Sequence, residues 1–135
     1  MRRSIIGSLI LVVYLGCSAA SKPSPLAILG RLDSAEVTVW PATGGAPLHS
    51  AFVRDSAALA ELRAIAIEPG DWQPITMATT PNGDVRAALY RGTVYVGVIS
   101  AGRTWIGARD TVGNERYRPM TLADSLRVAQ LRAVK

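Results

Sequence analysis

The chain is poor in the side chains on which most catalytic and metal sites depend. Its 135 residues include one cysteine, Cys17, and one histidine, His49. One cysteine cannot form an internal disulfide, and one histidine does not make a cluster of metal ligands. The ten Asp and Glu residues are dispersed, and no phosphate-binding loop, dinucleotide fingerprint or Gly-x-Ser-x-Gly elbow is present. We therefore expect no metal, no cofactor and no enzymatic activity.

An enzyme is the less favoured alternative. It would require Asp110, Glu115 or His49 to converge in a pocket, as acid–base catalysis demands. A solvated loop explains the two acids. His49 lies near the start of a predicted strand, where a surface or packed histidine is the favoured interpretation.

The net charge of the chain is also small. The whole chain has 15 Lys and Arg against 10 Asp and Glu, a net charge of +5. Removal of residues 1–16 takes away Arg2 and Arg3, which leaves 13 basic residues against 10 acids and a net charge of +3. The remaining arginines stand singly, with no basic run. We therefore expect no nucleic-acid partner.

The longest apolar run follows the cationic start of the chain. Ile5 to Leu15 are eleven residues, and Leu15-Gly16-Cys17-Ser18 follows. Eleven residues are too few to cross a hydrocarbon core, which needs about 20. A cationic start followed by a short apolar run is typical of a secretory signal.

The region around Cys17 resembles a bacterial lipoprotein signal, with small Gly16 before the cysteine. The resemblance covers this region alone, and Tyr14 and Leu15 differ from the leucine and small residue usual there. It implies a signal peptide over 1–16, lipidation of Cys17 with acyl chains such as palmitate, and an exported protein anchored to a membrane of the cell envelope. In a Gram-negative source, Ser18 implies the outer membrane.

A second cleavage position stays open. Ser18-Ala19-Ala20 is an ordinary small-residue cleavage site, after which a soluble secreted protein would begin near Ser21. In the lipoprotein reading, the serines and prolines from Ser18 to Pro25 indicate a flexible tether over 17–34. Residues 35–135 then suit one small domain.

The first half of this domain predicts a hairpin and a helix. Residues 36–40 alternate polar and apolar, 43–47 form a turn, and 48–53 return as a second strand. Asp55-Ser56 begins a helix, which Pro69-Gly70 ends. The apolar stripe of this helix consists of Leu59, Leu62, Ile65 and Ala66.

The second half predicts four strands and a second helix. The strands cover 72–79, 85–90, 93–99 and 104–109, and a polar connection covers 110–119. Thr121 to Asp124 resembles a capping box. The stripe of the helix that follows consists of Leu122, Leu126, Ala129 and Ala133, widened by Val128 and Leu131. The predicted class is α+β, in the order β(β)-α-β-β-β-β-α. A four-stranded antiparallel meander, which an N-terminal strand or hairpin can extend, carries two helices on one face.

The turns decide which side chains share a face. Two-residue loops at 91–92 and 101–102 place Leu89 opposite Val94 and Val98 opposite Trp105. The expected core face is then Val85, Ala87, Leu89, Val94, Val96, Val98 and Trp105, and Ile75 and Met77 join it only with an odd loop at 82–83. The other face carries Arg86, Ala88, Tyr90, Tyr95, Ile99 and Ile106.

A sheet face with aromatic and arginine side chains is typical of an interface. We expect partner contacts from Arg86, Tyr90, Tyr95, Ile99 and Ile106, or from the loop near 110–118, unless a hairpin or loop covers this face. The predicted function is a non-catalytic binding module for a protein or other envelope component, held at the membrane through Cys17. The alternative is an inhibitor or immunity-type protein, anchored or secreted, that blocks an envelope enzyme.

Overall fold

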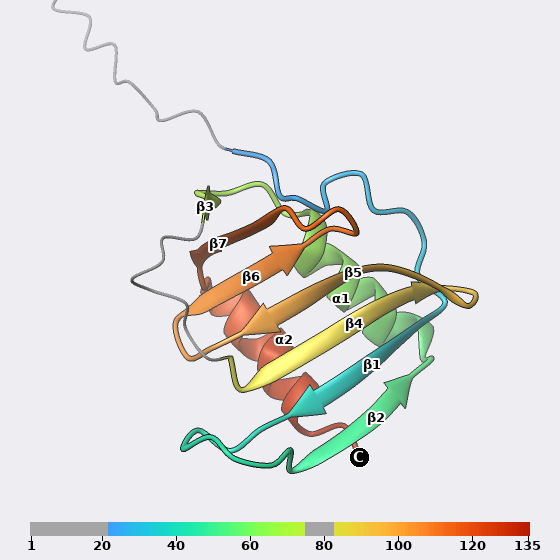
Figure 1. Cartoon of the computed structure of the whole chain (residues 1–135), viewed down its shortest axis with the longest axis vertical. Coiled ribbons are helices and arrows are strands. Elements are labelled where there is room, and N and C mark those ends of the chain that lie inside the picture. The colour runs from blue at the N-terminus through green and yellow to red at the C-terminus, as the bar shows by residue number, and fades with distance from the viewer. Residues whose placement is uncertain (1–21, 75–82) are drawn as a thin grey trace, which may run out of the picture.

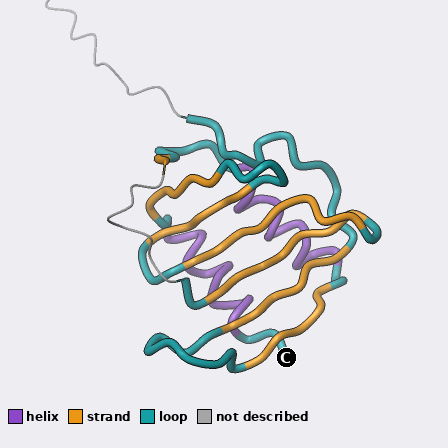
Figure 2. Tube along the Cα trace, in the orientation of Figure 1, coloured by secondary structure: helices purple, strands orange, loops and turns teal. Residues whose placement is uncertain are grey.

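The computed structural model describes residues 22–74 and 83–135. Its elements are β1 (Ser34–Val39), β2 (His49–Val53), α1 (Ser56–Ile67), β3 (Gln73–Pro74), β4 (Val85–Arg91), β5 (Val94–Ala101), β6 (Trp105–Arg109), β7 (Glu115–Pro119) and α2 (Leu122–Arg132). The strands form one antiparallel sheet in the order β2-β1-β4-β5-β6-β7-β3. Both helices lie behind one face of it (Figure 1), so the helices and the sheet form two layers (Figure 2). The predicted α+β class is confirmed.

The N-terminal hairpin and the first helix form as the sequence predicts. β1 and β2 pair from Ala35 opposite Val53 to Val39 opposite His49. Asp55 caps α1, since its side chain accepts a hydrogen bond from the amide of Ala58 at 2.9 Å. All four residues of the predicted stripe of α1 are buried against the sheet.

The prediction of a tether over 17–34 is wrong for residues 22–33. Leu26, Leu29 and Leu32 are buried in the core, and the hydroxyl of Ser24 donates to the carbonyl of Ala66. The serines and prolines around them suggested flexibility, but three leucines at a spacing of three residues bury enough apolar surface to fix the segment. The folded domain therefore begins no later than Lys22, and residues 17–21 lie outside the described part.

The register between β4 and β5 differs from the prediction in one decisive place. The chain turns at Gly92-Thr93 and at Arg103-Thr104, one and two residues later than expected. These shifts preserve the faces, because side chains alternate with a period of two. A bulge, however, places Leu89 opposite Gly97 while Tyr90 stays opposite Tyr95, so that Val96 is an extra residue in β5.

The bulge reverses the faces of every residue that follows it in β5 and β6. Ile99, Ala101, Ile106 and Ala108 join the core, whereas Val98 and Trp105 lie on the opposite face. The prediction of Val98 and Trp105 as core-face residues, and of Ile99 and Ile106 on the other face, is therefore wrong. Val94, also assigned to the core, is exposed, and Val96 is half-buried.

A further strand stands where a polar connection was expected. β7 pairs with β6 along its length and with the two-residue β3 on its other side. The sequence of β7, Glu-Arg-Tyr-Arg-Pro, has one hydrophobic residue, so its pattern gave no strand signal. Residues 75–79 of the expected strand, and Ile75, Met77 and Asn82 with them, lie outside the described residues.

The second helix buries Val128 and Leu131 as predicted, but the rest of its predicted stripe does not face the core. Leu122 and Leu126 are 79% and 62% exposed, whereas Asp124, Val128 and Leu131 are buried. The capping box is confirmed: Thr121 Oγ1 accepts from the amide of Asp124, and the Asp124 carboxylate accepts from the amide of Thr121. An inward carboxylate rotates the helix so that two leucines face solvent. Among the described residues, neither helix is long and apolar enough to cross a membrane.

Candidate functional site

The sheet has one face that no described helix covers, and we call it the open face. It is turned toward the viewer in Figure 1, with α1 and α2 behind. Strand pairing and alternation place on it the side chains of Glu36, Thr38, Ser50, Phe52, Arg86, Ala88, Tyr90, Tyr95, Val98, Ser100, Trp105, Arg109, Glu115 and Tyr117. Three of the partner-contact residues that the sequence predicts are among them: Arg86, Tyr90 and Tyr95.

The predicted contact residues separate into two groups. Arg86, Tyr90 and Tyr95 lie on the open face, where the two tyrosine rings meet edge to face with centroids 6.0 Å apart. Ile99 and Ile106 are 2% and 0% exposed and face the helices, so they cannot touch a partner. The bulge at Val96 explains the error, since both isoleucines follow it in the chain.

The open face contains a concavity of about 800 Å³. Its described lining comes from the loop between β1 and β2, the start of β4, the turn between β5 and β6, and the inner strands β4 to β7. The lining residues are Trp40, Pro41, Ala42, Thr43, Gly44, Gly45, Gly83, Asp84, Val85, Arg86, Val98, Ser100, Gly102, Arg103, Thr104, Trp105, Arg109, Glu115 and Tyr117. The sequence predicted contacts from Arg86 and from the loop near 110–118, which contains Glu115 and Tyr117, but it placed Val98 and Trp105 in the core.

Two aromatic rings lie close to the sheet in this concavity. Trp105 and Tyr117 meet edge to face, with centroids 4.9 Å apart and planes at 77°. A Cβ at Gly102 would come within 2.2 Å of the Trp105 ring, and one at Gly107 within 2.6 Å of the Tyr117 ring. Glycine at these two positions therefore lets the rings pack directly against backbone.

Three arginines give the concavity its charge. Arg86, Arg103 and Arg109 come from β4, the β5–β6 turn and β6, and none is in an ion pair within 4.0 Å. All ten Asp and Glu residues of the chain lie in the described ranges, so this holds for every carboxylate side chain. Of the two acids in the lining, Asp84 is paired with Arg132 at 2.9 Å.

The other acid, Glu115, is engaged by a tyrosine. Tyr117 donates its hydroxyl to Glu115 Oε1 at 2.9 Å. Burial raises the pKa of Tyr117 to about 12, and the hydrogen bond to Glu115 and its charge act in the same direction. Tyr117 is thus a neutral donor at physiological pH. The concavity combines cationic groups without ion-pair partners with aromatic surface, an arrangement that can bind an anion.

The three residues named for an enzyme do not converge. Asp110 holds the β6–β7 loop by accepting from the amides of Val112 and Asn114 and from the Asn114 side chain, and these hydrogen bonds, the side-chain one above all, lower its pKa. Glu115 lies on the open face of β7. His49 lies on β2, on the opposite face and five strands away, which corresponds to about 24 Å at the usual strand spacing.

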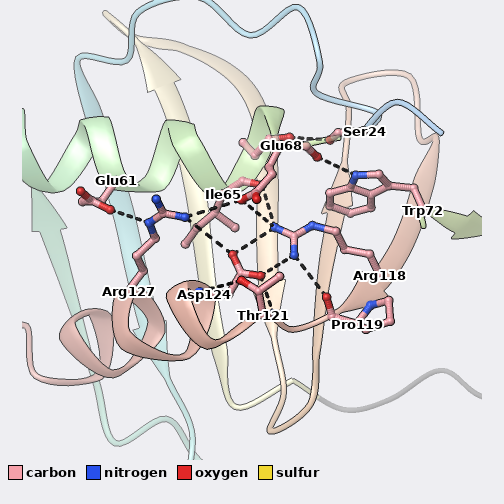
Figure 3. A network of polar contacts seen from close by, with 11 residues as sticks. Ser24, Glu61, Ile65, Glu68, Trp72, Arg118, Pro119, Thr121, Asp124 and Arg127 are labelled. Carbon is pink, nitrogen blue, oxygen red and sulfur yellow. Dashed lines mark hydrogen bonds and ion pairs between the residues drawn. The ribbon is translucent and has the colours of Figure 1, made fainter. Parts of the chain in front are cut away.

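A second polar cluster lies inside the molecule and was not predicted. Arg118 of β7 and Asp124 of α2 are 4% and 0% exposed and form an ion pair through two hydrogen bonds. Arg118 also donates to the carbonyls of Ile65 at 3.4 Å and Pro119 at 3.2 Å (Figure 3). The cluster therefore joins β7 to both helices.

Neighbouring side chains shield this ion pair from solvent. The Trp72 ring lies 5.1 Å from the Arg118 guanidinium, and its indole N–H donates to the carbonyl of Glu68 at 2.8 Å. Burial raises the pKa of Asp124, but hydrogen bonds and charge from Arg118, with hydrogen bonds from Thr121, outweigh it and lower the pKa below its ordinary value. Asp124 and two backbone carbonyls accept from the terminal nitrogens of Arg118, whereas its buried Nε has no hydrogen-bond partner among the described residues. We assign this cluster to the stability of the fold, because its charged groups are paired with each other.

Three comparisons with known proteins found no match for this chain. No family model, no curated protein and no solved structure matches it. Cys17 lies outside the described residues, so its lipidation stays a prediction from sequence.

Proposed function

We propose that this protein is an exported, lipid-anchored module that binds a component of the cell envelope through the open face without catalysing a reaction. One observation carries the proposal: both helices cover the same face of the sheet, and the other face has a concavity with three arginines that lack ion-pair partners.

The composition of the concavity supports binding over a purely structural role. Tyr, Trp and Arg are the residue types enriched in recognition surfaces, and they supply most of the binding free energy where they cluster. The fold also contains a matched contrast. Arg118 in the core has a carboxylate and two carbonyls as acceptors, whereas Arg86, Arg103 and Arg109 line the concavity and are in no ion pair within 4.0 Å.

The position of the anchor supports an envelope ligand. The packed chain begins by Lys22, whose amide pairs with the carbonyl of Gly70 at 2.9 Å. Only the segment from Cys17 to Lys22 could then separate the lipid from the domain. Five residue steps reach at most about 18 Å. A lipidated protein of this kind would meet ligands close to the membrane surface.

Binding is tested with the full-length protein in detergent and envelope material from which lipids have been extracted. We expect the wild type to co-sediment with this material, and Arg86→Glu and Arg109→Glu to lose at least about tenfold in apparent affinity. Arg31→Glu is the matched control, because the Arg31 side chain is 90% exposed and lies outside the concavity. Since the anchor is the same in all variants, the difference reports the open face. Equal binding by all four proteins would contradict the proposal.

The anchor is tested by intact mass of the protein from its native membrane fraction, compared with a Cys17→Ser variant. A lipid-sized increase that the variant lacks supports anchoring. A mass that begins near Ser21 without lipid would make the protein a freely diffusing secreted domain. A stoichiometric complex with a single enzyme would point to the inhibitor alternative.

A further inference from the structure

We propose that the concavity on the open face binds an acidic saccharide, with a sugar ring against Trp105 and Tyr117 and its anionic group on the arginines. This inference names the ligand class of the proposed binding site and rests on that proposal.

The anionic part of the ligand follows from charge. Arg86, Arg103 and Arg109 reach the concavity from three separate elements, and Asp84 and Glu115 are engaged by Arg132 and Tyr117. A guanidinium binds a carboxylate or phosphate through parallel hydrogen bonds, which are stronger than bonds between neutral groups. An anion with several oxygens can therefore contact the arginines that no carboxylate of the chain occupies.

The ring part of the ligand follows from the shape of the floor. Glycines at 102 and 107 leave room for the Trp105 and Tyr117 rings against backbone, where any larger residue would collide with them. The C–H face of a pyranose is flat and apolar, and it gains free energy when it is buried against an aromatic ring. Trp40 adds a third aromatic side chain to the lining.

The sheet topology favours a saccharide over an acidic peptide. Extended peptides usually bind by adding a strand to a free sheet edge, where their amides and carbonyls find partners. The strands beneath this concavity, β4 to β7, are inner strands, each paired on both sides in the order β2-β1-β4-β5-β6-β7-β3. A peptide lying there would leave its backbone groups without sheet partners. Sugar hydroxyls can instead bond to water and to side chains such as Ser100.

Titration of the full-length protein with three defined probes tests the inference. The probes are a hexamer of galacturonic acid, neutral maltohexaose and hexaglutamate, and the signals are intrinsic tryptophan fluorescence and calorimetry. We expect the acidic hexasaccharide to bind at least about tenfold more tightly than the neutral one, and its affinity to fall as salt is added. Arg103→Gln and Arg109→Gln are each expected to weaken it about tenfold. Trp105→Ala should do the same.

Two variants control for position, and one protects the test against misfolding. Arg31→Gln removes an exposed arginine elsewhere, and Phe52→Ala removes an exposed ring from the same face outside the concavity, so both should bind as the wild type does. If Trp105→Ala fails to fold, Arg103→Gln decides the test. Arg103 is exposed in a turn, and its side chain makes no hydrogen bond to the described residues, so its replacement should not disturb the fold.

Three results would overturn the inference: no binding of the acidic hexasaccharide, equal binding of hexaglutamate, or unchanged binding by the arginine variants. The envelope assay then separates the two proposals. If envelope binding still requires Arg109, the open face is a binding site and only the ligand class is wrong. If envelope binding requires neither Arg86 nor Arg109, both proposals fail.

Discussion

Replacement of Asp124 by asparagine tests how far the buried ion pair stabilises the fold. The variant keeps the size of the side chain and an oxygen that can accept from the amide of Thr121, so the capping box is largely retained. It leaves the Arg118 guanidinium, 4% exposed, without its buried countercharge. Loss of one partner of a buried pair costs about 3–5 kcal/mol. Glu68 lies 3.8 Å from Arg118 and offsets part of this, so we expect a loss of about 3 kcal/mol.

Urea unfolding measures this loss. Small domains have an unfolding free energy of about 5–15 kcal/mol, and at a slope of about 1.5 kcal/mol per molar the midpoint should fall by about 2 M. Glu61→Gln is the matched control, because Glu61 pairs with Arg127 at 2.6 Å but its side chain is 50% exposed. An exposed pair contributes at most about 1 kcal/mol. If Asp124→Asn costs no more than Glu61→Gln, the reasoning from burial is wrong.

The same pair predicts a pH dependence with a definite sign. The pKa of Asp124 is lowered in the folded state. Its contribution to the free energy of unfolding is therefore fully present above the unfolded value of about 3.9 and is lost as pH falls through the lower folded pKa. The stability difference between wild type and Asp124→Asn should shrink as pH drops below about 4. A difference that stays constant down to acid unfolding would refute this assignment.

Three further predictions concern packing, backbone and ionisation. Leu26→Ala should cost about 2–5 kcal/mol in urea unfolding, whereas Ile28→Ala, at a side chain that is 98% exposed, should cost almost nothing; similar values would mean that the segment is not packed. Gly97→Ala should destabilise by at least about 2 kcal/mol, since its φ is +152° and a Cβ would lie 2.6 Å from Leu26, whereas Gly44→Ala at φ +81° meets no atom within 4 Å and should cost about 1 kcal/mol. Ultraviolet titration should show a tyrosine with a pKa of about 12 that Tyr117→Phe removes. Because the pKa of Tyr117 is raised in the folded state, the contribution of Tyr117 to stability is complete below about pH 10 and is lost as pH rises toward 12. An unchanged titration curve in the variant would contradict this assignment.

The parts of the fold that the sequence predicts correctly depend on neighbours in the chain. Asp55 and Thr121 cap helices through amides three residues away, and the four buried residues of α1 follow the helical period. The alternation in β1 likewise marks its buried side. In each case the physical cause operates within a few residues, so a short window of sequence contains it.

The parts that were wrong depend on contacts between distant segments. Arg118 attracts Asp124 into the core and thereby turns the leucines of α2 outward, although a polar residue in a helix normally indicates a solvated face. The Ser24 hydroxyl finds an acceptor on Ala66, 42 residues along the chain, which composition cannot reveal. Local patterns assign polarity to a position, but only the tertiary structure decides whether a polar group has a buried partner.

The bulge at Val96 connects this limit to the candidate site. Without it, Trp105 and Val98 would face the helices and Ile99 and Ile106 would face solvent, as the sequence pattern favours. One extra residue reverses the arrangement: two isoleucines complete the core, and a tryptophan comes to lie beside Tyr117, Arg103 and Arg109 on the open face. Bulges often redirect side chains near functional sites, and local rules tend to fail where function sets the structure. Both residues that the bulge moves to the open face, Val98 and Trp105, line the concavity, so one local irregularity forms part of the proposed binding site.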